Sequence, residues 1–312
     1  MDISVVIATH NQKERLRLVL SALKDQHFSE NRLEIIVVDD GSTDGTSAML
    51  SSLQSTGLRV ESFAKNSGRC HARNAGIKEA CGALVVFLDG DALPAPDLLL
   101  RYWQSHQKNG DNAVLCGDQY VLPHLEFLQD PQTGSLFDIP LSCSARKHLT
   151  QQRERIIVTE DRVRRDFSSI AAQSSEGGYP FPQVRALQRE FHELCTKAPN
   201  SPLAWLGLYP HNMAVPLALL KEVGGFDEAI PFCEGWELGY RLKRAGAQFI
   251  RARALSYHLY HYHDFSDPAK AKAETAKRYA AVEYLAHTHS DPFVYLIHFW
   301  WAHLWPNPFF PE

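Results

Sequence analysis

The 312-residue sequence has no strong charge imbalance, no Cys-x-x-Cys pair and no internal repeat, and each absence excludes a class of protein. A formal net charge of −4 gives no general attraction to nucleic acid or anionic lipid, and we expect no nucleic-acid partner. The six cysteines are scattered, and the N-terminus lacks the basic start and apolar core of a signal peptide. Both features predict a reducing, cytoplasmic location.

What the chain does contain is typical of a globular enzyme, with 45% hydrophobic and 22% charged residues. Apolar strands are predicted at residues 3–9, 33–38, 58–63 and 83–88. Helix-like stretches lie between them, the first of which is amphipathic and ends near residue 24. This alternation predicts βαβ units and a parallel sheet whose functional loops gather at one edge.

The most informative segment is Asp89-Gly90-Asp91, which directly follows the apolar run at residues 83–88. A run that is continuously apolar predicts a buried parallel strand, and open α/β sheets bind ligands at the carboxyl ends of such strands. Two carboxylates there offer hard oxygen ligands to Mg²⁺ or Mn²⁺, and the glycine allows a close approach. A turn after a strand is the alternative interpretation, because Asp and Gly are common in turns.

Seven short motifs occur in a fixed order along the chain. They are SVVIATHN (4–11), VVDDGSTD (37–44), ARNAG (72–76), FLDGD (87–91), NMAVP (212–216), VGGFDE (223–228) and EGWELGYRL (234–242). Each motif is common, but the ordered set resembles the family 2 glycosyltransferases of the GT-A fold. The resemblance spans roughly residues 3–263.

The resemblance implies an α/β protein of the GT-A fold, with a Rossmann-like, mostly parallel sheet and helices on both faces. We expect a nucleotide-sugar-binding half at residues 1–120 and a fused acceptor-binding half at residues 121–265. The second half carries a charged insertion at residues 144–200, and a helical, aromatic-rich tail follows at residues 266–312.

Transfer from a nucleotide sugar releases a diphosphate, whose developing charge a divalent cation neutralises as a Lewis acid. By the resemblance, Asp91 binds this Mn²⁺ or Mg²⁺ directly, and Asp89 contacts the ribose or reaches the metal through water.

The resemblance also implies a nucleotide pocket formed by the loops after the first strands. Asp39 or Asp40 accepts a hydrogen bond from the base, which favours uracil, and Thr9 and Asn11 line the pocket. Arg73 contacts the nucleotide or, as an alternative, pairs with one of the strand-end aspartates.

Fifteen histidines are present, and their densest cluster lies at residues 257–263. In a regular strand His261 and His263 share one face and His258 the other, so the three cannot all bind one ion. An aromatic and histidine surface is one interpretation. By the resemblance, His258 completes the metal site, and His261 is the second choice.

An inverting transfer needs a base that takes the proton from the acceptor hydroxyl. The family usually places an Asp after a Glu at the position where this chain has Glu234 and Gly235, so the usual base is missing. We expect Glu234 to replace it, with Glu237 as a less favoured substitute that also suits an ion pair with Arg241.

Two further residues are assigned to the acceptor side by the resemblance. Asn212 begins one of the later motifs, and Trp236 packs either under the acceptor or in the core.

Two segments have open interpretations. The charged stretch at residues 144–165 predicts a solvated helix or a mobile loop, or else a cover over the donor or an anionic acceptor. A helix is expected from residue 267 to about residue 287, followed by an apolar stretch at residues 292–306 that is too short to cross a bilayer. That stretch packs on the catalytic domain, docks at the inner membrane surface or forms a subunit contact in a homo-oligomer.

Taken together, the sequence predicts a metal-dependent, inverting glycosyltransferase that uses a nucleotide sugar, most readily a UDP-sugar. The expected acceptor is a glycan, a lipid-linked glycan or a secondary metabolite. Because of Gly235, a nucleotide-sugar-binding pseudoenzyme or scaffold is the alternative. A nucleotidyltransferase is less favoured, because no glycine-rich, lysine-containing loop follows Ala8.

Overall fold

The computed structural model describes residues 1–53, 57–139, 141–175, 182–262, 268–291 and 294. Its centre is one eight-stranded sheet with the strand order β3-β2-β1-β4-β9-β6-β10-β5. The strands are β1 (Ile3–Thr9), β2 (Leu33–Asp39), β3 (Leu58–Ser62), β4 (Leu84–Asp89), β5 (Ala92–Pro94), β6 (Ala113–Val121), β9 (Asn212–Pro216) and β10 (Gln248–His258).

Most strands of this sheet run in the same direction. Strand β1 pairs in parallel with β2 and with β4, β2 pairs in parallel with β3, and β6 pairs in parallel with β10. Strands β9 and β5 are antiparallel to their neighbours. The predicted mostly parallel sheet is therefore confirmed. Strand β9 lies between β4 and β6, so the two predicted halves of the chain share one sheet.

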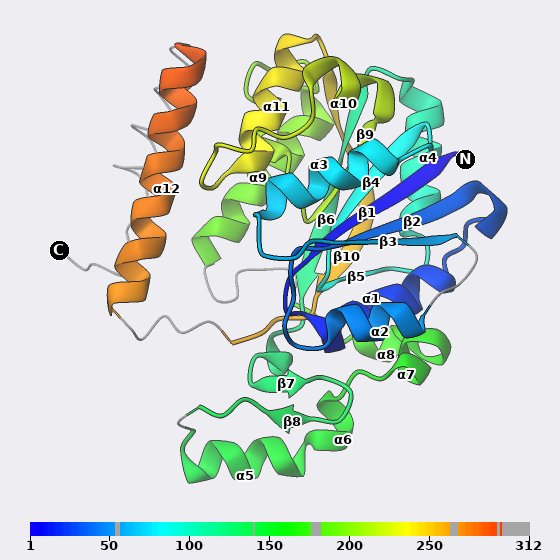
Figure 1. Ribbon diagram of the computed structural model, residues 1–312, viewed down its shortest axis with the longest axis vertical. Helices are drawn as coiled ribbons and strands as arrows, with labels where there is room; N and C mark the ends of the chain where they lie inside the picture. The colour runs from blue at the N-terminus through cyan, green and yellow to red at the C-terminus, as the bar shows by residue number, and fades with distance from the viewer. Residues whose placement is uncertain (54–56, 140, 176–181, 263–267, 292–293, 295–312) are drawn as a thin grey trace.

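Helices cover both faces of the sheet (Figure 1). One core contains residues of α1 (Lys13–Lys24), α2 (Thr46–Ser52), α4 (Leu98–Asn109), α7 (Glu160–Arg165) and α8 (Phe167–Ala171). The other contains residues of α3 (Arg69–Glu79), α9 (Pro182–Lys197), α10 (Leu217–Val223), α11 (Glu234–Arg244) and α12 (Pro268–His289).

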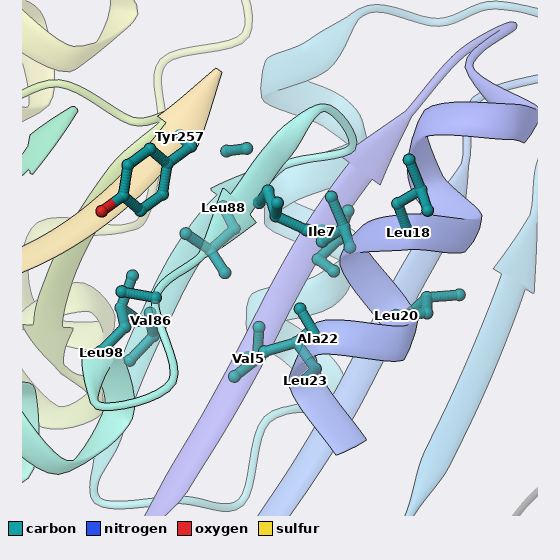
Figure 2. Packing of buried hydrophobic residues seen from close by; sticks show 14 of the residues in the cluster. Val5, Ile7, Leu18, Leu20, Ala22, Leu23, Val86, Leu88, Leu98 and Tyr257 are labelled. Carbon is teal, nitrogen blue, oxygen red and sulfur yellow. The ribbon is translucent and has the colours of Figure 1, made fainter. Parts of the chain in front are cut away.

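Strand alternation decides which residues enter which core. Leu84, Val86 and Leu88 of β4 pack in the first core, and Val85 and Phe87 pack in the second. Figure 2 shows the first core, where the apolar face of α1 lies over β1 and β4. The same alternation directs the next residue, Asp89, toward the α3 face.

The charged insertion is largely helical. Helices α5 (Cys143–Gln151) and α6 (Arg153–Ile156) project from the body together with strands β7 (Leu128–Asp130) and β8 (Ser135–Leu136), which precede the insertion (Figure 1). Helix α5 has no buried residue, as the prediction of a solvated helix requires. Helices α7 and α8 return to the core through Val163 and Ile170.

The predicted tail helix is present as α12 and packs against the body through Ala281, Leu285 and Ala286. The Tyr284 hydroxyl donates to Asp227 Oδ2 at 2.7 Å. The apolar stretch at residues 292–306 lies outside the described residues except for Val294, which is buried. Among the described helices, none combines the length and apolarity that a membrane crossing needs.

Candidate active site

The predicted nucleotide and metal residues meet at the carboxyl edge of the sheet. Strand register places Thr9 of β1 beside Asp39 of β2, and Ala8 beside Asp89 of β4. The end of β10 reaches the same region, because His258 pairs with Ala92 directly after the Asp-Gly-Asp turn.

Asp91 lies between two imidazoles. Its Oδ2 is 3.3 Å from His258 Nε2 and 3.5 Å from His261 Nε2, and it accepts a hydrogen bond from Gln12 Nε2 at 3.0 Å. One ligand atom from each of Asp91, His258 and His261 lies within 4.8 Å of the others. Burial opposes ionisation of Asp91, but the two imidazoles outweigh it and hold the pKa of this carboxyl well below its usual range.

The expectation that a regular strand separates the histidines is wrong, because β10 ends at His258. The backbone turns there, with Tyr260 N donating to the His258 carbonyl and Leu259 N donating to the Asp91 carbonyl, both at 2.8 Å. This turn brings His261 to the same carboxylate as His258. The third histidine of the cluster, His263, lies outside the described residues.

The donor set of this cluster fits a divalent cation. One carboxylate oxygen and two imidazole nitrogens suit a first-row transition ion such as Mn²⁺ better than Mg²⁺, which prefers oxygen ligands throughout.

Asp89 belongs to a different network from Asp91. Arg73 Nη2 donates to Asp89 Oδ1 and Arg73 Nη1 to Glu234 Oε1, each at 2.8 Å. Arg69 Nη1 is 3.6 Å from the same Glu234 oxygen. Burial would lower the pKa of Arg73, but Asp89 and Glu234 raise it, so the guanidinium stays charged. The predicted pairing of Arg73 with a strand-end aspartate is confirmed.

Glu234 is buried and ionised at neutral pH. Burial would raise its pKa, but Arg73 and Arg69 lower the pKa of this carboxyl below its ordinary value.

Asp39 at the end of β2 and Asp40 directly after it hold the loops around them. Asp39 accepts hydrogen bonds from Ser42 N and the Ser47 hydroxyl. Asp40 accepts hydrogen bonds from the backbone N–H groups of Ser67 and Gly68, at 2.6 and 2.9 Å. Both aspartates are buried, so their described contacts are structural, and a base contact stays a prediction.

Asn11 fixes the same pair of loops. Its Oδ1 accepts a hydrogen bond from Thr43 N at 2.8 Å, and its backbone adopts a left-handed φ of 53°.

Thr9 lies beneath the Asp-Gly-Asp turn. Its hydroxyl is buried and has no hydrogen-bond partner in the described part of the chain. A Cβ at Gly90 would lie 3.0 Å from this hydroxyl and 2.7 Å from Gln12 Oε1. A side chain at Gly90 would therefore need Gln12 and Thr9 to shift, and glycine allows the turn to pack closely.

The two acceptor residues predicted from the resemblance are in the interior. Asn212 is 1% exposed, donates to the carbonyls of Asp118 and Ala254 and accepts from the Tyr102 hydroxyl. Trp236 is buried and donates from Nε1 to the Leu206 carbonyl at 3.1 Å. These hydrogen bonds hold core elements together. The assignment of Asn212 to the acceptor side therefore stays a prediction, and the core interpretation of Trp236 is supported.

The described partners of the Glu237 carboxylate lie on α11 and α12. The carboxylate accepts from Arg241 Nε at 2.6 Å and lies 3.1 Å from His289 Nε2 of α12. It therefore forms the ion pair that was its alternative interpretation.

Gly235 is enclosed by the segment before β9. A Cβ at this position would lie 2.5 Å from Pro210 Cδ and 2.8 Å from the Leu208 carbonyl oxygen. The family's usual aspartate therefore does not fit here in the present packing.

Sequence reasoning missed Gln12, which donates to Asp91, and Arg15, which donates to a carbonyl in the turn between His258 and His261. The sequence signal for Arg15 was its position four residues before Val19, which places a charged side chain on the apolar face of the first helix.

Several known proteins are similar to this chain over most of its length. The glycosyltransferase YfnE of Bacillus subtilis, described as uncharacterized, is 28% identical over 268 residues, which are 84% of this chain and 65% of YfnE. The validoxylamine A glucosyltransferase of Streptomyces hygroscopicus subsp. limoneus is 29% identical over 263 residues, 80% of this chain and 50% of that protein. The chain thus spans about half to two thirds of these relatives.

Solved structures share the fold. The mannosyltransferase PcManGT of Pyrobaculum calidifontis, in complex with GDP-Man and Mn²⁺, has a TM-score of 0.59 at 17% identity, covering 98% of this chain and 70% of PcManGT. TarS 1–349 of S. aureus, in complex with UDP, has a TM-score of 0.53 at 18% identity, covering 94% of this chain and 73% of TarS 1–349. The predicted GT-A fold is confirmed.

A family model described as glycosyl transferase family 2 matches residues 4–166, just over half of the 312 residues. This match includes the Asp-Gly-Asp turn and Arg73. The chain belongs to glycosyl transferase family 2.

Proposed function

We propose that the protein is a metal-dependent, inverting glycosyltransferase that uses a nucleotide sugar. The observation that carries this proposal is the cluster of Asp91, His258 and His261 beside the Asp89–Arg73 pair. A cation site and a charged guanidinium next to each other are suited to a diphosphate leaving group. Structural neighbours contain UDP, UDP-GlcNAc or GDP-Man, the last with Mn²⁺.

The residues of the cluster and of the Asp89–Arg73 pair have different proposed roles. The ionised Asp91 and the two imidazoles would hold Mn²⁺ in preference to Mg²⁺, and the bound ion would neutralise the departing diphosphate. Asp89 orients Arg73 through their 2.8 Å ion pair and is itself 37% exposed, which suits a contact with the ribose. We retain a UDP-sugar as the first donor to test.

Glu234 is our proposed base. It is ionised, and Arg73 connects it directly to Asp89, whereas Glu237 faces Arg241 and His289. As the acceptor oxygen bonds to the anomeric carbon and the bond to the diphosphate breaks, the hydroxyl proton passes to Glu234. The acceptor itself is proposed as a glycan, a lipid-linked glycan or a secondary metabolite, classes that include the validoxylamine A named for one relative.

The proposal is tested by measuring donor hydrolysis and transfer with UDP-, GDP- and dTDP-sugars, in EDTA and with added Mn²⁺ or Mg²⁺. Turnover is expected with one donor, restored after EDTA by Mn²⁺ more than by Mg²⁺. Asp91→Asn should abolish it, because the amide lacks the negative charge that binds the cation. Asp97→Asn is the matched control, since Asp97 pairs with Arg101 on the surface and should keep wild-type turnover.

A nucleotide-sugar-binding protein without transfer activity is the second candidate. It is favoured by the packing at Gly235, which leaves no room for the usual aspartate, and by the two arginines that engage Glu234. Tight Mn²⁺-dependent binding of a nucleotide sugar, with no turnover of any donor in wild type, would favour this candidate.

A further inference from the structure

Arg15 of α1 is a buried cation whose described hydrogen bonds all go to backbone carbonyls, and its guanidinium carbon also lies 6.0 Å from the centre of the Phe137 ring. Its Nε donates to the Leu259 carbonyl at 2.8 Å, and its Nη2 donates to the Tyr260 carbonyl at 3.2 Å. On the other side, Nη2 donates to the Leu128 carbonyl at 2.8 Å and Nη1 to the Gln129 carbonyl at 3.2 Å. One guanidinium therefore joins α1 to two segments that are distant in the sequence.

This arrangement costs free energy that a surface arginine avoids. Arg15 is 6% exposed and forms no ion pair among the described residues. A buried cation is unfavourable unless hydrogen bonds replace its water, and here four carbonyl contacts do so. Burial lowers the pKa of Arg15 to about 10, so the side chain stays charged at neutral pH.

Two of the four carbonyls belong to the residues between the candidate metal-binding histidines. Leu259 and Tyr260 lie between His258 and His261, and both are buried, so the guanidinium takes the place of water at their carbonyls. The same turn is held from its other side by the bond from Leu259 N to the Asp91 carbonyl. Arg15 and the Asp91 backbone thus hold the turn between the histidines from two directions.

We propose that Arg15 is a positioning residue for the metal site, which keeps His261 beside His258 and Asp91 by fixing the turn between the two histidines. The inference rests on the proposed metal site. Loss of the guanidinium should let the turn relax and move His261 away from Asp91, so its effect on metal affinity should act through His261.

The test is a double-mutant cycle on the full chain with Mn²⁺ affinity as the readout, measured from the electron paramagnetic resonance signal of free Mn²⁺. Arg15→Met and His261→Ala should each weaken Mn²⁺ binding about 10–100-fold, the usual effect of losing a group that orients a ligand. The double variant should bind no more weakly than the weaker single variant, because both changes remove the same ligand.

Arg162→Met is the matched control. Arg162 also donates to two backbone carbonyls, those of Arg155 and Ile157, but outside the metal cluster. Its Mn²⁺ affinity should equal that of wild type. Arg15→Lys keeps the charge without the four-carbonyl contact and should weaken binding less than Arg15→Met does.

Each other outcome overturns the inference. If Arg15→Met binds Mn²⁺ as tightly as wild type, Arg15 does not act on the site. If the loss of Mn²⁺ affinity in the double variant equals the product of the two single losses, Arg15 does not act through His261. If Arg15→Met does not fold, Arg15→Lys takes its place in the cycle with the same criterion. Absence of Mn²⁺ binding by wild type would overturn the proposed metal site as well, which separates the two failures.

Discussion

At the scale of single residues, one glycine separates two carboxylates that have different partners. Asp89 continues the alternation of β4 and meets Arg73 on the α3 side. Asp91, after the turn at Gly90, meets the histidines at the end of β10. A carboxylate beside two imidazoles and a carboxylate paired with a guanidinium are thus provided by one short turn, because Gly90 lets the turn pack closely on Thr9.

The role of Glu234 leads to a first prediction. Glu234→Gln keeps the size of the side chain but cannot accept a proton, so turnover should fall about 10²–10⁴-fold while donor affinity changes little. Glu237→Gln should cost much less turnover, since Glu237 pairs with Arg241. Steady-state kinetics with the identified donor checks both variants. A greater loss in Glu237→Gln than in Glu234→Gln would overturn the assignment.

The same residue predicts a dependence of stability on pH. Because the folded state lowers the pKa of Glu234, its ionised form stabilises the fold above the ordinary glutamate pKa, and this contribution is lost as pH falls through the lower, folded pKa. Glu234→Gln should therefore reduce the free energy of unfolding by about 1–3 kcal/mol at pH 7. The difference from wild type should shrink below about pH 4.3. Urea unfolding at pH 7 and at descending acidic pH measures it, and a difference that is constant with pH would contradict it.

At the scale of elements, the entrance of α11 is decided by packing against the segment before β9. Cys233 precedes the helix with a left-handed φ of 58°, and Gly235 then lies against Pro210 and the Leu208 carbonyl. Gly235 itself has no positive φ, so the need for glycine here is one of space.

This packing predicts that restoring the family's usual aspartate fails. Gly235→Asp should destabilise the protein by about 1–3 kcal/mol through overpacking and should not raise turnover. Ala229→Asp, which adds the same carboxylate in the exposed loop before α11, should change stability by less than about 0.5 kcal/mol. Thermal and urea unfolding compare the two. A Gly235→Asp protein as stable as wild type and more active would show that the segment at Pro210 moves aside.

At the scale of the whole molecule, α12 joins the body of the protein by packing beside α10 and α11. His289 contacts Glu237, Asp291 accepts from the Tyr240 hydroxyl, and Leu285 is buried in the second core. The helix is therefore part of the folded unit, covering apolar residues of the α10–α11 layer.

Removal of residues 268–312 should expose that layer and leave Glu237 without its histidine partner. We expect a lower melting temperature and aggregation, because a newly exposed apolar surface associates. Size-exclusion chromatography and thermal unfolding measure both effects. Tyr284→Phe, which removes the hydroxyl that bonds Asp227 but keeps the helix, is the control and should cost about 0.5–1.5 kcal/mol without aggregation. A truncated protein that stays monomeric and equally stable would contradict this account.

The sequence by itself determined the parallel sheet and the place of the acidic turn. Apolar runs of strand length that end in Asp or Gly are local patterns, and parallel strands bring their carboxyl ends to one edge whatever the rest of the chain does. Asp89 and Asp91 were therefore predicted to lie at this edge of the sheet, and the pairing of β4 with β1 and of Ala92 with His258 puts them there.

Only the tertiary structure decided which groups complete the site. The bond from Arg15 to the Leu259 carbonyl joins residues 244 positions apart, and the turn that brings His261 to Asp91 begins where β10 ends. Likewise, Pro210 rather than any local pattern excludes a side chain at Gly235. Such contacts depend on how distant segments pack, and neither periodicity nor motif spacing contains that information.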